Sequence, residues 1–359
     1  MDKVVYLLGA GFSAPLGLPL MNNFLPKAKD LFVGDQSRYQ HFAKVFERID
    51  KMHVAKSYYE ADLTNIEEIL SILEMRERVD GSDTEFFTHF LRDVITGYTP
   101  KTPKLNLSCA NWYADPAGAN WNPFFAFVMS LMRLKLTLAT IDDYKHKKQR
   151  LHAEVTDKLQ AEYGVISLNY DRTLEHMAEC LNDVSLAGFG NPSQGINAVF
   201  TTDDNDELEN TARVPLAKLH GCVSTEQIIA PTWNKGLGPA MVETWGKARE
   251  LLATANQIRI IGYSLPITDA YIKYLLKSAA IESFNLKKID VLCLDPSGKA
   301  ANRYGEFITF NFFRFASKST ESYLGHIASR VTTAIQDSSA SYHTLEDAHE
   351  EFFSAHGRA

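Results

Sequence analysis

A glycine-rich turn near the amino terminus has the residue types that bind phosphate. It reads Gly9-Ala10-Gly11-Phe12-Ser13 and follows an apolar run, residues 4–8, that has the character of a buried parallel strand. Glycines let backbone N–H groups approach a pyrophosphate without interference from Cβ atoms, and the start of a following helix favours an anion. We therefore expect Gly9, Ala10, Gly11, Phe12 and Ser13 to line a phosphate-binding turn.

Three further clusters of polar and glycine residues follow other predicted strands. They are Leu168-Asn169-Tyr170-Asp171, Leu219-His220-Gly221 and Ile261-Gly262-Tyr263-Ser264-Leu265. A doubly wound sheet builds a dinucleotide site at the carboxyl ends of its parallel strands. The position of the four clusters thus predicts such a site in this chain.

Asn169, His220 and Asp171 are the candidate catalytic residues. Asn169 offers a donor and an acceptor without charge, which suits orienting a water or a ribose hydroxyl; alternatively, it ends a strand by bonding local backbone. A neutral His220 ring accepts a proton near pH 7 and would act as a general base; the alternative is a hydrogen-bonded core histidine. Asp171 either orients a ribose hydroxyl or caps a helix predicted from Thr173.

Asp295 is the candidate contact for the adenosine ribose. It follows the predicted strand 289–294, where a carboxylate would accept hydrogen bonds from ribose hydroxyls, but it would also serve as a turn residue before Pro296. The Gly262-Tyr263-Ser264 segment is expected in a tight loop near the same ribose.

Strands and helices are predicted to alternate from residue 164 onward, which indicates an α/β fold. We expect a doubly wound, Rossmann-like, mostly parallel sheet of about six strands with a helical insertion after the first strand. The predicted strands are residues 4–8, 164–168, 214–219, 257–261, 289–294 and 307–313. The predicted helices between them are residues 173–181, 241–255 and 269–280.

The domain boundaries follow from this pattern. Residues 1–21 and 164–318 would form the nucleotide-binding domain, residues 22–163 the insertion, and residues 319–359 two closing helices, at about 320–335 and 343–355. Helices are predicted in the insertion at 66–78, 85–95 and 123–139, the first opened by a capping box in Thr64-Asn65-Ile66-Glu67.

A long loop, residues 99–122, is rich in Pro, Asn and Trp, and we expect it to be a mobile gate. Trp112, Trp121 and Trp233 would either form an aromatic wall or lid or pack in the core.

Composition excludes several classes of protein. The 359 residues are 45% hydrophobic and carry a formal net charge of −7, which argues against a dominant role in direct nucleic-acid binding. The basic cluster 145–150 is expected to be a solvated helix start. No run has the length of a membrane helix and no secretory signal is visible, so a cytoplasmic location is expected. The four cysteines contain no Cys-x-x-Cys pair, so neither a zinc ribbon nor another metal site is expected.

The order of these motifs resembles the sirtuin superfamily, and most closely its prokaryotic NAD-cleaving branch, several of whose members act in antiphage defence. The resemblance rests on Gly-Ala-Gly-x-Ser with Gly17-Leu18-Pro19, then Asn-x-Asp, His-Gly and Gly-x-Ser-Leu. Asn65–Leu70, Ala230–Lys235 and Ile261–Pro266 support it. Two departures put protein deacylation in doubt: Leu20-Met21-Asn22-Asn23 stands where deacylases have an acidic residue, Phe and Arg, and the four-cysteine zinc ribbon is absent.

The resemblance implies NAD+ as substrate, without zinc, and adds Gly17, Leu18 and Pro19 to the nucleotide-binding residues. It implies an NAD+ hydrolase that releases nicotinamide and ADP-ribose and defends its cell by NAD depletion, in the manner of abortive infection. The alternatives are a zinc-free deacylase, an ADP-ribosyltransferase or cyclase, and a catalytically idle nucleotide-binding scaffold or sensor. The expected partners are further copies of the chain in a homo-oligomer and a HerA-like ATPase or other defence-system protein.

Overall fold

Seven strands form one parallel sheet in the order β5-β6-β4-β1-β7-β8-β9. This computed structural model describes residues 1–59, 61–80, 85–101, 121–143, 146–155, 161–187, 197–201, 211–225, 228–229, 239–336 and 344–358. The strands are β1 (Asp2–Leu8), β4 (Ala161–Ser167), β5 (Asn197–Thr201), β6 (Thr211–Lys218), β7 (Gln257–Ile261), β8 (Lys288–Leu292) and β9 (Phe313–Ala316).

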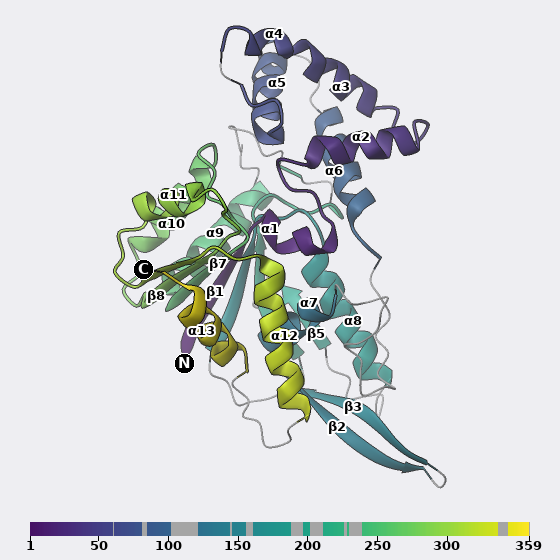
Figure 1. Cartoon of the computed structure of the whole chain (residues 1–359), viewed down its shortest axis with the longest axis vertical. Helices are drawn as coiled ribbons and strands as arrows, with labels where there is room; N and C mark the ends of the chain where they lie inside the picture. Colours follow the sequence, from purple (N-terminus) through teal and green to yellow (C-terminus); the bar gives the residue numbers. More distant parts are fainter. Residues whose placement is uncertain are drawn as a thin grey trace.

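β1 lies in the middle of the sheet because both of its faces are apolar. Val4 and Tyr6 point into one core cluster and Val5 and Leu7 into another, and all four are buried. Helices therefore cover both faces (Figure 1). The predicted doubly wound α/β fold is confirmed, with a seventh strand, β5, at one edge.

Two groups of helices cover the sheet. The helices α7 (Asn122–Leu131), α8 (Thr173–Ala187), α12 (Thr320–Gln336) and α13 (Thr344–His356) share a core cluster with Tyr6. On the opposite face lie α9 (Pro239–Thr254), α10 (Ala270–Ala280) and α11 (Lys299–Phe307).

The residues after β1 form a short turn of helix and then a separate helical layer. The turn comprises α1 (Ala10–Ser13) and the 3₁₀ helix η1 (Ala14–Leu16). The helical layer comprises α2 (Phe24–Gly34), α3 (Phe42–Lys51), α4 (His53–Lys56), α5 (Ile66–Asp80) and α6 (Glu85–Tyr98). Figure 1 shows this layer beyond the end of the sheet at which α1 lies.

The rest of the insertion differs from the prediction. The helix expected over 123–139 ends at Leu131, and an antiparallel hairpin follows, formed by β2 (Leu134–Asp143) and β3 (His146–Val155). Leucine alternates with other residues from Leu134, a period that suits a strand, and Arg133 has a φ of 59°, which breaks the helix. The part of the basic cluster that lies in the described chain is therefore in a strand and not at a helix start.

The strand predicted over 307–313 is also wrong. Residues up to Phe307 belong to α11, whose buried residues Ala300 and Tyr304 are one helical turn apart, and the strand begins only at Phe313. Aromatic residues at alternate positions produced the strand pattern, although Phe312 is exposed.

A buried polar network attaches α13 to the sheet. The Arg259 guanidinium of β7 lies 2.6 Å from the carboxylate of Glu346, and Arg259 is buried. His349 Nε2 lies 2.9 Å from Asp290 of β8, and its Nδ1 lies 2.9 Å from the Tyr323 hydroxyl. Since a buried charge is tolerated only when it is paired, these contacts fix where the closing helix sits.

Candidate functional site

The four predicted clusters lie side by side at one edge of the sheet. The register pairs Leu8 with both Ser167 and Ile261, and Ser167 with Lys218. The next residues of β1, β4, β6 and β7 therefore emerge together at the carboxyl ends of these strands. This is the point at which the chain crosses from one side of β1 to the other, where open α/β sheets bind their ligands.

The glycines of the first turn are required for close packing against the loop after β7. A Cβ on Gly9 would lie 2.6 Å from the Gly262 carbonyl oxygen, and one on Gly262 would lie 2.3 Å from the Phe12 nitrogen. Gly9 and Gly11 donate their amides to the carbonyls of Ile261 and Gly262, at 3.0 and 2.8 Å. Both amides thus hold two loops together in this structure rather than being turned toward a phosphate.

Asn169 is fixed by this turn. Its Nδ2 donates to the Gly9 carbonyl oxygen at 3.0 Å and to Ser13 Oγ at 3.2 Å, and its own amide donates to Ser167 Oγ at 3.1 Å. A carbonyl only accepts, so the amide nitrogen faces β1 and Oδ1 faces away from it. Among the described residues none donates to Oδ1, which leaves an acceptor of fixed orientation in a nearly buried position.

His220 is held in one orientation by the end of the neighbouring strand. Its Nδ1 lies 3.0 Å from the Leu168 carbonyl oxygen, and the ring centre lies 5.8 Å from that of Tyr170. Because a carbonyl accepts, Nδ1 carries the hydrogen in the neutral ring and Nε2 carries the lone pair. Gly221, which follows, has a φ of 81°, a left-handed backbone that favours glycine.

The two aspartates each make the structural contact that the sequence left as an alternative. Asp171 Oδ1 accepts the amide of Thr173 at 2.9 Å, at the start of α8. Asp295 Oδ2 accepts the amide of Ala301 at 2.8 Å in the first turn of α11, and Oδ1 accepts from Ser297 Oγ at 3.1 Å. Both carboxylates therefore satisfy backbone or side-chain donors of their own chain.

The other predicted nucleotide-binding residues have these places. Gly17 ends η1 with a φ of 88°, and its carbonyl accepts from Lys27 Nζ at 3.0 Å; Leu18 is buried beyond it and Pro19 is half-buried. Tyr263 donates from its hydroxyl to Asp269 at 2.7 Å, and the Ser264 carbonyl accepts from Arg303 at 2.8 Å. Ala10 stands on the surface of the turn and Phe12 is buried beneath it.

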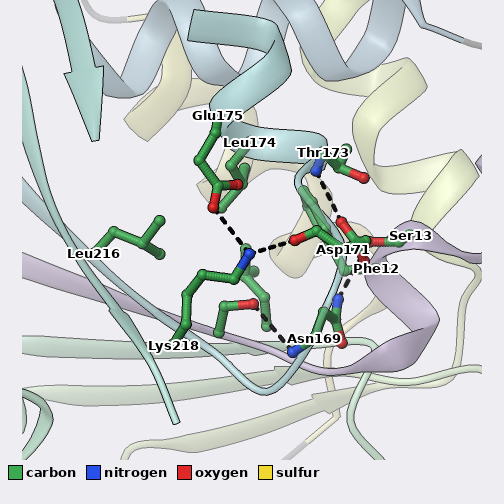
Figure 2. A pocket seen from close by; sticks show the side chains of 11 residues that line it. Phe12, Ser13, Asn169, Asp171, Thr173, Leu174, Glu175, Leu216 and Lys218 are labelled. Atoms are coloured by element: carbon green, nitrogen blue, oxygen red, sulfur yellow. Dashed lines mark hydrogen bonds and ion pairs between the residues drawn. The ribbon is translucent and has the colours of Figure 1, made fainter. Parts of the chain in front are cut away.

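A small cavity lined by both polar and apolar side chains adjoins Asn169 (Figure 2). Its volume is about 10 Å³, which is room for one water, so a dinucleotide does not fit inside it. Lys218 reaches it and bonds Glu175 at 2.9 Å and the Asp171 carbonyl. Burial opposes the charge of Lys218, but the negative charges of Glu175, Cys222 and Asp171 and the bond to Glu175 together raise the pKa of the lysine. The Thr173 hydroxyl, also on the lining, is buried and has no hydrogen-bond partner among the described residues, as expected of a group that bonds a water.

Glu67 of α5 is a residue of this region whose role the sequence did not reveal. The predicted capping box is wrong, because Asn65 precedes the helix and its Oδ1 accepts the Glu67 amide at 2.9 Å. The Glu67 carboxylate instead accepts from Thr268 Oγ1 at 2.9 Å, in the loop after β7. Glu67 is only 6% exposed. The sequence shows an acidic residue at the start of a helix, but the burial of that residue is visible only in the fold.

The charge of Glu67 affects the pKa values of two buried tyrosines near it, Tyr170 and Tyr263. Burial raises the pKa of Tyr170 well above its usual range, and the charges of Glu67 and Asp269 raise it further. Burial and the charges of Asp269 and Glu67 also raise the pKa of Tyr263. The acidic side chains thus lie near both the loop that bears Asn169 and the loop that bears Gly262.

No group of three or more His, Cys, Asp or Glu side chains arranged for a metal occurs among the described residues. Cys180, Cys222 and Cys293 form no disulfide in the described part of the chain, whereas Cys109 lies outside it. None of the described helices is long and apolar enough to cross a membrane.

Several predicted features fall outside the described residues. These are Trp112, Trp233, most of the loop 99–122 and the segment 230–235. Trp121 is buried at the start of α7, in the core.

No protein-family model matches the sequence, and no curated protein matches it. Among solved structures, the chain is similar to Sir2Tm bound to a propionylated peptide, at a TM-score of 0.35 and 12% identity over 91% of this chain and 92% of that one. It is also similar to SIR2 in complex with an inhibitor, 2'-O-acetyl-ADP-ribose and a deacetylated peptide, at a TM-score of 0.32 and 12% identity over 91% and 93%.

Proposed function

We propose that the chain is an NAD+ hydrolase that breaks the bond between nicotinamide and ribose. The observation that carries the proposal is the pair formed by Asn169 and His220. Both are nearly buried at adjacent strand ends, and each is held by a carbonyl so that an acceptor atom is fixed. This arrangement supplies a proton acceptor and an orienting group without a metal.

In this mechanism His220 acts through Nε2. With the hydrogen held on Nδ1 by the Leu168 carbonyl, Nε2 accepts a proton from a water or from a ribose hydroxyl. When water loses the proton, its oxygen forms a bond to C1 of the ribose while the bond from C1 to the nicotinamide nitrogen breaks, and nicotinamide leaves with that electron pair.

Asn169 supplies the orientation. Its Oδ1 accepts from the attacking water or from a ribose hydroxyl, and its Nδ2 is anchored by Gly9 and Ser13. Bond breaking at C1 places positive charge on the ribose, as in glycoside hydrolysis, so an acceptor oxygen nearby stabilises the transition state. In this proposal the loops at the carboxyl ends of β1, β4, β6 and β7 hold the nucleotide. The cavity of about 10 Å³ beside Asn169 has room only for a water.

The test is incubation of the purified chain with NAD+, with nicotinamide, ADP-ribose and cyclic ADP-ribose separated by chromatography. Equal release of nicotinamide and ADP-ribose supports hydrolysis. A cyclic product, or ADP-ribose attached to protein, supports the cyclase or transferase alternative. Intact NAD+ after long incubation, with binding detected by calorimetry, supports the scaffold or sensor alternative.

The cellular role is proposed from the motif resemblance alone. A chain that consumes NAD+ needs an off state, so we propose a homo-oligomer whose turnover changes with a defence partner such as a HerA-like ATPase. Light scattering at several protein concentrations, with turnover measured in each fraction, tests this part. A monomer that is fully active alone would refute it.

A further inference from the structure

The helical layer inserted after β1 holds two of the site loops. Glu67 of α5 accepts from Thr268 Oγ1 at 2.9 Å, in the loop after β7. Arg92 of α6 donates from Nη2 to the carbonyl oxygen of Thr225 at 3.0 Å, in the loop that begins with His220. Since β4 and β1 lie between β6 and β7, the two contacts stand on either side of Asn169 and the glycine turn.

The Glu67 contact is the stronger of the two. Glu67 is 6% exposed, whereas the contact of Arg92 lies at the surface. A buried carboxylate is stable only where hydrogen bonds replace its water, so its position in the fold is tightly determined. Glu68, the next residue of the same helix, is half-buried and offers a comparison with the same chemistry.

A continuous set of contacts leads from Glu67 to Asn169. Thr268 is followed by Asp269, which accepts from the Tyr263 hydroxyl at 2.7 Å. Tyr263 follows Gly262, whose carbonyl accepts the Gly11 amide, and the turn that contains Gly11 anchors Asn169 through Ser13 and Gly9. The loop after β7 is packed tightly against the glycine turn at Gly262, because a Cβ on Gly262 would lie 2.3 Å from the Phe12 nitrogen.

We propose that Glu67 is a positioning residue for the Asn169 and His220 site: through its hydrogen bond to Thr268 it fixes the loop 262–269 against the glycine turn. The inserted helices therefore set the rate of NAD+ cleavage without contacting NAD+. The inference rests on the proposed function and adds a route by which a partner bound to the inserted helices changes turnover.

The first test is a double-mutant cycle on nicotinamide release. Glu67→Ala and Thr268→Val each remove one side of the hydrogen bond, and we expect each to lower kcat/KM by at least about tenfold, since a small misplacement of catalytic groups costs up to about 10²-fold. The double variant should lose no more than Glu67→Ala alone, because that substitution already breaks this hydrogen bond. Glu67→Gln keeps an acceptor oxygen and should restore most of the activity.

Glu68→Ala is the matched control and should stay within about twofold of wild type, because the half-buried Glu68 carboxylate makes no hydrogen bond to the described residues of the site loops. Thermal unfolding of each variant shows whether a loss of activity is merely a loss of fold. If Glu67→Ala equals Glu68→Ala in kcat/KM, or if the losses of Glu67→Ala and Thr268→Val multiply, the inference is overturned.

The second test needs no activity. Hydrogen exchange of the ligand-free protein follows the amides of Gly262 and Asp269, which donate to the carbonyls of Leu292 and Pro266. Glu67→Ala should speed exchange at both amides and Glu68→Ala at neither. Unchanged exchange overturns the inference whatever the activity of the wild type. A wild type that cleaves no NAD+, with faster exchange in Glu67→Ala, overturns the proposed function and leaves the loop contact supported.

Discussion

The Nδ2 atom of Asn169 lies 3.0 Å from the carbonyl oxygen of Gly9, a contact across 160 residues of sequence. It joins the end of β4 to the end of β1 and decides which atom of the Asn169 amide faces outward. The orientation of the candidate catalytic amide therefore depends on a backbone turn that has no reactive side chain at that point.

Asn169→Ala and His220→Ala should each lower the rate of nicotinamide release by about 10²–10⁴-fold, the usual effect of removing one positioned acid–base group. Asn302→Ala and His356→Ala are the controls, because both side chains are exposed on helices away from the site. Release is measured by chromatography, and circular dichroism checks that each variant is folded. Wild-type turnover in either site variant would remove that residue from the mechanism.

Sequence reasoning was most accurate where one local pattern decides the structure. The stretch 257–261 predicted β7 with the bounds that the structure has, because its three isoleucines favour a buried strand even though Gln257 and Arg259 are polar. The alternation of strands and helices likewise predicted the doubly wound sheet. A glycine directly after such a strand also indicated a strand-end turn.

The parts that were missed depend on contacts between distant segments. Glu67 fits a capping box locally, but the carboxylate gains more from Thr268, which lies 201 residues away. Likewise, the sequence suggests a phosphate turn at Gly9 and a tight loop near a ribose at Gly262, whereas the packing of the two glycines against each other is visible only in space. The hairpin of β2 and β3 was missed because a leucine-rich stretch after a helix is compatible with more helix.

The unfolding free energy should fall as the pH drops from about 6.5 to 4 because of His349. Burial, together with the charge of Arg259, lowers the pKa of His349 from 6.5 to about 4. The unfolded chain therefore binds a proton in this range while the folded chain does not. The contribution of His349 to the free energy of unfolding is thus fully present above the range and is lost as the pH falls through it. The loss from this group is about 3 kcal/mol at most.

Urea unfolding at several pH values measures this effect. His349→Gln keeps a donor toward Asp290 but does not titrate, so its stability should change less between pH 7 and 4.5 than that of the wild type. His326→Gln, on a half-exposed residue of α12, should keep the wild-type slope. An identical slope in His349→Gln would show that other groups carry the pH dependence.

Folding and NAD+ cleavage should not require zinc. Structural zinc sites contribute directly to folding, and chelators unfold proteins that depend on them. Treatment with a strong chelator should therefore leave the melting temperature and nicotinamide release unchanged. Stoichiometric zinc by elemental analysis, together with unfolding after chelation, would contradict this and direct attention to residues outside the described part of the chain.

Gly262→Ala should slow NAD+ cleavage strongly, and Gly298→Ala should leave it nearly unchanged. Both glycines have a positive φ, 69° and 73°, so an alanine at either position costs about 1–2 kcal/mol of backbone strain. They differ in space: a Cβ at Gly262 would lie 2.3 Å from the Phe12 nitrogen, whereas nothing lies within 4 Å of one at Gly298. Only Gly262→Ala must therefore displace the glycine turn, and with it the anchor of Asn169.

Comparing the two variants separates strain from displacement. Similar falls in melting temperature are expected from the shared strain, with a further fall in Gly262→Ala from the clash. Nicotinamide release should stay within about threefold of wild type in Gly298→Ala, since its strain does not reach the site, and fall by about 10²-fold in Gly262→Ala, as for a misplaced catalytic group. If a folded Gly262→Ala variant cleaves NAD+ as fast as Gly298→Ala does, the packing of the turn against the loop after β7 does not control the catalytic amide.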